Sequence, residues 1–304
     1  MRAFAVKLQY LLAMSRLHRI SRQLSVAVLT AGFFALAAVA PVIAAAAPAG
    51  DLIQQPAGSK LFKNGTGFMW GTSEGSFVIV RTEDNGKTWS KLDLAGVSID
   101  LNALSIAPGG RPSPVFAHFE DPDHGWVVWS ENDSVLRIAN TTDSGASWQE
   151  ALSLQTDTVL NRQAFPGPGR ACLLAEMPEG MMHTTMVIVA TDDNGVTWTS
   201  SELQGDGVTD WTFRSATDGF LLIFNPGGDN ILFYRTTDGG KSWQSVDLPL
   251  PPKAEGVAGV FGGKIAFSGP KRLDGRLTVR ILQSGWVNLT YRTTDGGKTW
   301  TYSK

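Results

Sequence analysis

An eight-residue pattern occurs five times in this chain and constrains the fold more than any other feature. It reads Thr-x-Asp-x-Gly-x-(Ser/Thr)-Trp, and each copy is called a box below. A pattern that recurs every 45 to 59 residues is typical of an architecture built from similar units. The fixed positions are Thr82, Asp84, Gly86 and Trp89; Thr141, Asp143, Gly145 and Trp148; Thr191, Asp193, Gly195 and Trp198; Thr236, Asp238, Gly240 and Trp243; and Thr293, Asp295, Gly297 and Trp300.

Each box is predicted to form the corner of a β-hairpin. A short apolar stretch of strand character precedes it, as at 76–80, 186–189 and 231–234. The Asp-x-Gly core is typical of a turn, because Asp accepts bonds from backbone N–H groups two residues on and Gly adopts positive φ. The Trp then lies on the returning strand, where it covers the turn.

The boxes match at every fixed position the motif of the Asp-box, or bacterial neuraminidase repeat, families, which the chain therefore resembles. In those families the box joins the third and fourth strands of a β-propeller blade and lies on the outer rim, away from any active site. The resemblance implies an all-β propeller in which the box residues are structural.

Box spacing predicts five four-stranded blades, because a propeller blade takes roughly 40 to 50 residues. The expected blades span about 51–98, 99–155, 156–205, 206–250 and 253–304. Only Thr301–Lys304 follow the last box, which is short for a complete outer strand. We therefore expect residues 51–56 to pair with the last blade as its missing edge strand.

Residues 1–47 are predicted to be a signal peptide or a signal anchor. A basic front without acidic residues precedes an apolar run rich in Ala, Leu, Val and Phe. The remaining part, a single domain over 51–304, is then periplasmic or secreted, and contacts a membrane only through the leader if that is uncleaved. Beyond residue 47 there are 21 basic and 28 acidic residues. This acidic excess argues against nucleic acid as a partner, because nucleic-acid binding requires a basic surface.

Catalytic and metal signatures are weak. The boxes lack the alternating oxygen ligands and closing Glu of a calcium loop, and the histidines show no metal-ligand spacing, so no metal or cofactor is expected. Sialidases, the best-known Asp-box enzymes, use a Tyr nucleophile and three Arg. Here Tyr234 and Tyr291 each lie two residues before a box Thr, and the other repeats have Val or Ala at that position. Tyr302 lies in the last strand. A sialidase-type exo-glycosidase remains the alternative.

The His124-Gly125-Trp126 stretch followed by a box is similar to another Asp-box group, the photosystem II stability and assembly factor-like propellers. These are docking proteins without a known catalytic centre. We therefore predict a monomeric, non-catalytic propeller that binds a protein or carbohydrate at the mouth of its channel, opposite the boxes. The candidate binding residues are Trp70, Trp126, Trp129, Trp211, Arg214, Arg272, Asp274 and Arg276. For each Trp, packing between blades is the competing interpretation.

Overall fold

The computed structural model describes residues 47–303 apart from 95–96, 98, 100–105, 108–110, 113–114, 132–134, 156–159, 179–183, 229, 249 and 255–258. All of them belong to the second of the chain's two units, Ile43–Lys304. Residues 1–46, and with them nearly all of the predicted leader, lie outside the described residues. Among the helices of the described part, none combines the length and apolarity needed to cross a bilayer.

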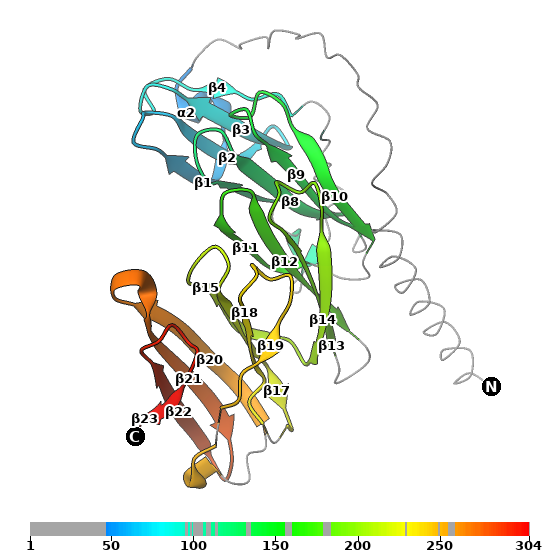
Figure 1. Ribbon diagram of the computed structural model, residues 1–304. Helices are drawn as coiled ribbons and strands as arrows, with labels where there is room; N and C mark the ends of the chain where they lie inside the picture. Colours follow the sequence, from blue (N-terminus) through cyan, green and yellow to red (C-terminus); the bar gives the residue numbers. More distant parts are fainter. Residues whose placement is uncertain are drawn as a thin grey trace, which may run out of the picture. The chain divides into compact units, whose positions relative to one another are not determined.

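The fold is all-β, as predicted, and consists of antiparallel sheets that follow one another along the chain (Figure 1). The first sheet contains β1 (Gln55–Leu61), β2 (Gly67–Ser73), β3 (Ser76–Thr82) and β4 (Ser90–Lys91), and the second contains β7 (Phe116–Phe119), β8 (Gly125–Glu131), β9 (Val135–Thr141) and β10 (Gln149–Gln155). The third contains β11 (Leu160–Gly167), β12 (Arg170–Pro178), β13 (Thr184–Thr191) and β14 (Thr199–Gly205).

The fourth sheet contains β15 (Val208–Phe213), β16 (Gly219–Ile223), β18 (Phe233–Thr236) and β19 (Gln244–Ser245). The fifth contains β17 (Asn225–Pro226), β20 (Gly259–Ser268), β21 (Asp274–Leu282), β22 (Trp286–Thr293) and β23 (Thr301–Ser303). The remaining elements are the short pair β5 (Ile106–Ala107) and β6 (Arg111–Pro112), the helix α2 (Ala49–Leu52) and the 3-10 turns η1 (Pro252–Ala254) and η2 (Pro270–Arg272).

Each box joins the last two strands of its sheet. The box Thr ends a long strand, as Thr191 ends β13, and the outer strand begins directly after the box Trp, as β14 begins at Thr199. Because side chains alternate across a strand, a central strand with two apolar rows, such as β16, contacts a neighbouring sheet on either side. This pattern explains why β16 is buried along its whole length.

The cores between sheets form a series. One cluster joins the first and second sheets, the next joins the second and third, a third joins the third and fourth, and the largest joins the fourth and fifth. Within the described residues, no core cluster joins the fifth sheet to the first. The first sheet instead packs its other face, through Val78, Val80 and Trp89, against Ile53 and the helix α2.

The predicted pairing of residues 51–56 with the last sheet is therefore wrong. Gln55 and Pro56 begin β1, which pairs antiparallel with β2 of the first sheet, and the N–H of Gln54 donates to the carbonyl of Thr72. The fifth sheet instead gains the two-residue strand β17, which comes from the predicted fourth blade and pairs with β20. Burial of the apolar Ile53 side chain against Val78 and Val80 holds this segment on the first sheet, which follows it directly in the chain. The open edge of the fifth sheet lies far along the chain and offers this segment no such contact among the described residues.

Replacing Ile53 with Ala should lower the free energy of unfolding by about 2 to 4 kcal/mol, because the side chain is only 4% exposed and its loss leaves a cavity against the first sheet. Urea denaturation measures this change. Leu61→Ala is the matched control, since Leu61 lies in the same sheet but is 54% exposed. Equal effects of the two substitutions would contradict the packing of Ile53.

Candidate functional site

The five boxes share one hydrogen-bonded geometry. In the third, the Thr191 hydroxyl donates to Asp193 Oδ1 at 2.8 Å and accepts from the Gly195 N–H at 3.1 Å. The backbone N–H and hydroxyl of Thr197 both donate to the Asp193 carboxylate, at 2.9 and 2.5 Å. The sequence analysis expected the carboxylate to accept from N–H groups two residues on, but the main backbone donor lies four residues on.

The box backbone is left-handed at two consecutive residues. Besides the box Gly, the residue before it has positive φ, for example 58° at Asn194 and 82° at Gly239. Asn and Gly tolerate this conformation best. The box Gly also makes a close approach, since a Cβ on Gly240 would lie 2.4 Å from Sγ of Cys172 in the neighbouring sheet. Cys172 is buried in that core, as the sequence predicted.

Hydrogen bonds stabilise the ionised form of the box aspartates. A bond from the Thr88 hydroxyl, followed by bonds from the Thr88 N–H and the Thr82 hydroxyl, lowers the pKa of Asp84 to about 2. At Asp193 burial alone would raise the pKa, but the bonds from Thr197 outweigh it and the pKa is lowered. These carboxylates are fully engaged in the turn, which leaves them unsuited to proton transfer near neutral pH.

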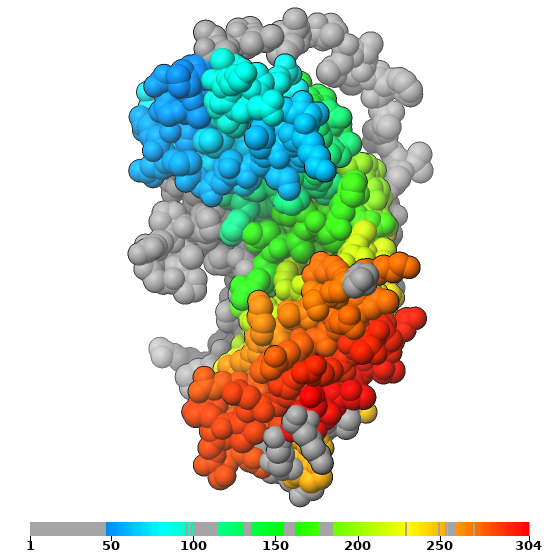
Figure 2. Space-filling model, turned by 90° about the vertical axis from the view of Figure 1, so that its left-hand side faces the viewer, coloured from blue at the N-terminus to red at the C-terminus, as the bar shows by residue number. Residues whose placement is uncertain are grey.

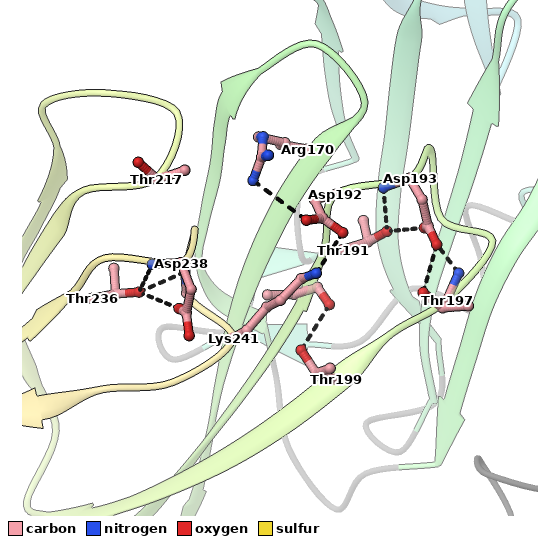
Figure 3. A network of polar contacts seen from close by, with 12 residues as sticks. Arg170, Thr191, Asp192, Asp193, Thr197, Thr199, Thr217, Thr236, Asp238 and Lys241 are labelled. Atoms are coloured by element: carbon pink, nitrogen blue, oxygen red, sulfur yellow. Dashed lines mark hydrogen bonds and ion pairs between the residues drawn. The ribbon is translucent and has the colours of Figure 1, made fainter.

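Charged side chains connect neighbouring boxes. Lys241 in the fourth box donates to Asp192 in the third at 2.5 Å, and Arg170 lies 3.8 Å from the same carboxylate (Figure 3). The N–H of Gly239 also donates to the carbonyl of Thr217 in the preceding hairpin of its own sheet, at 2.8 Å. The boxes therefore act as a joined scaffold along one edge of the third and fourth sheets.

A concave pocket of about 400 Å³ lies at this edge, between the first strands of the third and fourth sheets and η2 of the fifth. Its aromatic walls are Phe165, Trp211 and Phe213, and its cationic groups are Arg214 and Arg272. Ala164, Pro166, Thr212 and Ser215 complete the lining. The structure thus brings the candidate Arg272 together with Trp211 and Arg214, two candidates that lie much earlier in the chain.

The fourth box supports the aromatic wall. Trp243, its last residue, stacks on Trp211 with ring centroids 6.3 Å apart, and contacts Phe213 edge-on at 6.2 Å. The indole N–H of Trp243 donates to the carbonyl of Gly240 at 3.1 Å. Stacked and edge-on rings limit the rotamers available to Trp211, so the wall is held in place before any ligand arrives.

A buried carboxylate orients the cationic side of the pocket. Asp218, which is buried, accepts a bond from Arg214 and a fork of two bonds from Arg235, at 2.9 and 2.8 Å. The hydrogen bond to Asp218 raises the pKa of Arg235. Arg272 donates to the carbonyl of Phe213 at 3.2 Å and is otherwise exposed. The cationic groups that line the pocket itself are Arg214, bound to Asp218, and the exposed Arg272.

The pocket lies at the edge of the sheets that carries the boxes, whereas the sequence analysis expected the site on the opposite edge. Gly219, just after the Arg214–Asp218 turn, pairs with the box residue Thr236, and Gly275, just after η2, pairs with Thr293. The first hairpin turn and the box of a sheet must share an edge, because the chain reverses direction at every strand.

The other candidates lie elsewhere. Trp126 and Trp129 are each 1% exposed and belong to the cores on either side of the second sheet. Trp70 packs over Gly58, where a Cβ would lie 2.4 Å from its ring. These three Trp side chains therefore pack in the cores between sheets, which is the competing interpretation given above. Asp274 and Arg276 are exposed on β21 and do not line the pocket.

Glu120 was not among the residues predicted from the sequence, but the structure gives it an unusual setting. Glu120 follows β7 and accepts bonds from the Gly169 N–H at 2.9 Å and from the Trp126 indole at 3.4 Å. Burial raises the pKa of Glu120 to about 7. Nearby, His118 stacks on Phe165 with centroids 4.5 Å apart, and burial lowers the pKa of this His to about 4. No local motif predicts the bond from Gly169 or the stacking on Phe165, since both of these residues come from the third sheet.

Comparisons with known proteins confirm the Asp-box resemblance. Residues 291–302 match the BNR/Asp-box repeat family. The chain is 23% identical over 274 residues to a sialidase of Bacteroides fragilis (strain YCH46), covering 73% of this chain and 50% of the sialidase. It is 29% identical over 142 residues to the photosystem II assembly lipoprotein Ycf48 of Synechococcus sp. (strain CC9902), covering 44% of this chain and 37% of that protein.

Among solved structures, the GH74 xyloglucanase from Xanthomonas campestris aligns with a TM-score of 0.43 and 15% identity, over 79% of this chain and 36% of that chain. The matches to the two curated relatives span half of the sialidase and little more than a third of the assembly lipoprotein. Both motif-based resemblances, to sialidases and to assembly-factor propellers, are thus supported by sequence similarity over part of each relative's length.

Glu120→Gln tests the buried carboxyl through the pH dependence of stability. A folded-state pKa of about 7, above the ordinary 4.5, means that the unfolded chain releases the proton first. The parent should therefore lose stability relative to E120Q as pH rises from about 4.5 to 7, and the difference should level off above that range. Urea denaturation across this range measures the difference, with Glu202→Gln as a control at an exposed position. A constant difference would contradict the assignment.

Proposed function

We propose that residues 51–304 form a five-bladed Asp-box propeller, exported by a signal peptide or anchor at 1–47, which binds a protein or glycan without catalysing a reaction. The five sheets, each with a box between its last two strands, are interpreted as the blades. The protein then acts in the periplasm or outside the cell, as a monomeric scaffold whose ligand enters the pocket at the box edge.

The observation that carries this proposal is the pocket itself. It combines an aromatic wall, formed by Trp211 and Phe213, with the guanidinium of Arg272 at its rim. Aromatic rings supply flat apolar area for a sugar ring or an apolar side chain, and the guanidinium supplies donors to carboxylate, hydroxyl or carbonyl oxygens. Trp243 holds the aromatic wall and the carbonyl of Phe213 holds Arg272, which reduces the entropy lost on binding.

The tyrosines support a non-catalytic role. Tyr291 is fully buried between the last two sheets, and burial raises its pKa to about 12, whereas an activated nucleophile needs a lowered pKa. Tyr234 packs in the core between the third and fourth sheets. Within the described residues, no group of three His, Cys, Asp or Glu side chains is arranged to hold a metal ion.

A binding screen tests the proposal. The chain without residues 1–47 should bind at least one member of a glycan array or one purified extracytoplasmic protein. Arg272→Gln should weaken that binding about tenfold, because it removes a charged donor without changing the wall. Trp211→Ala should weaken it further, while Lys87→Gln, an exposed cation of the first box, should not. Binding that is unchanged in both pocket variants would place the ligand elsewhere and overturn the proposal.

The rival activity is a sialidase-type exo-glycosidase, favoured by the similarity to the Bacteroides sialidase along most of the chain. A panel of fluorogenic sialosides separates the two functions. We expect no turnover above that of a heat-inactivated sample. Turnover that disappears in Arg214→Gln or Arg276→Gln would establish the enzyme and remove the binding-only proposal.

A further inference from the structure

The two faces of the fifth sheet differ sharply. One face carries Leu277, Val279 and Ile281 and is buried against the fourth sheet. On the opposite face the register of β21 and β22 sets Arg276 beside Arg292, Thr278 beside Thr290, Arg280 beside Asn288 and Leu282 beside Trp286. All but the two threonines and Leu282 are exposed. This second face is called the arginine face below, and Figure 2 shows the orange-to-red segment that contains it at the molecular surface.

The three arginines of this face, Arg276, Arg280 and Arg292, lack an acidic partner, since no carboxylate forms an ion pair with them in the part of the chain that the structure describes. Asp274 lies two residues before Arg276 at the box edge and makes no such pair either. Arg276 and Arg292 are directly opposite on adjacent strands, an arrangement that destabilises a sheet when the charges have the same sign. Their repulsion is relieved if an anion binds between them.

An exposed aromatic ring lies at the other end of the face. Trp286 is 54% exposed, and the Arg280 guanidinium lies 4.2 Å from its ring centroid. Phe261 meets the same ring edge-on at 5.3 Å. A β-bulge between Val260 and Gly262 adds Phe261 to β20 as an extra residue, and bulges commonly redirect a side chain in this way. The ring of Trp286 is therefore supported from two sides.

We propose that the arginine face is a binding surface for an acidic polysaccharide, distinct from the pocket at the box edge. Carboxylate groups of the sugar chain bind the paired guanidinium groups of Arg276 and Arg292 and, about 13 Å along the strand, that of Arg280. A sugar ring lies against the exposed part of Trp286. Thr278, Thr290 and Asn288, located between the arginines, bind its hydroxyl groups.

Other occupants fit these residues less well. A second copy docked through the same face would bring two sets of unpaired arginines together, which is unfavourable. The first sheet is not a suitable partner for the arginine face either, because α2 and Ile53 already cover its outer apolar face. A membrane surface calls for several protruding apolar side chains, and this face has one exposed aromatic residue. Alternating hydroxyl, amide and guanidinium groups instead match the chemistry of a charged sugar.

Binding of polygalacturonate to the chain without residues 1–47, measured by calorimetry at low and physiological salt, tests the proposal. The parent should bind it, and bind neutral dextran far more weakly. Each of Arg276→Gln and Arg292→Gln should weaken binding by about three- to tenfold and reduce its salt dependence. Trp286→Ala should weaken it about fivefold with the salt dependence unchanged.

Lys91→Gln is the matched control, because it removes one exposed cation from the first sheet with the same change in net charge as either arginine variant. Melting temperatures verify folding, and the arginine variants should melt at or above the parent temperature, since they remove a repulsion. The proposal is overturned if the arginine variants bind polygalacturonate like the control. Poly-glutamate or anionic vesicles binding as tightly, with no effect of Trp286→Ala, would equally overturn the sugar assignment. Arg272→Gln separates this surface from the pocket, because it should leave polygalacturonate binding unchanged.

Discussion

The turn in which a Thr hydroxyl and an Asp carboxylate bind each other and the backbone around them is the interaction on which this structure depends. It holds two consecutive residues in the left-handed conformation, which is energetically unfavourable for most residues. Several charge-assisted hydrogen bonds to the Asp carboxylate offset this strain. Because the turn ends on a Trp, it also places a large ring against a hydrophobic core of the sheet. Because each of the five sheets contains one such corner, the spacing of the corners is the length of the chain's repeating unit.

The same corners determine where a ligand can be held. Trp243 supports the pocket wall, and the fifth box approaches the pocket closely, since a Cβ on Gly296 would lie 2.9 Å from Cζ of Arg214. Boxes are structural in this interpretation, and yet they contribute indirectly to recognition. A scaffold that is rigid at one edge of the sheets provides a preorganised site there without any catalytic group.

The first and fifth sheets, at the two ends of the series, differ in what their outer faces carry and in what covers them. At the first sheet, Ile53 and α2 cover the outer apolar face, so that end is closed by the chain's own residues. At the fifth sheet the outer face is not apolar but carries arginines, polar side chains and Trp286, so it needs no apolar cover. Local side-chain chemistry on single strands thus decides which end of the series is closed and which remains available for a partner.

The sequence by itself determined the all-β class, the position of each box, the buried setting of Cys172 and the approximate limits of the sheets, because these follow from local turn chemistry and from the alternation of apolar residues. It also identified Trp211, Arg214 and Arg272 as candidates. Only the tertiary structure decided that these three meet at the box edge, that Trp126 and Trp129 are buried, and that residues 51–56 belong to the first sheet. These outcomes depend on tertiary contacts, such as Phe165 with His118 of another sheet or Ile53 with Val78, whose partners are far apart in the chain or leave no local pattern.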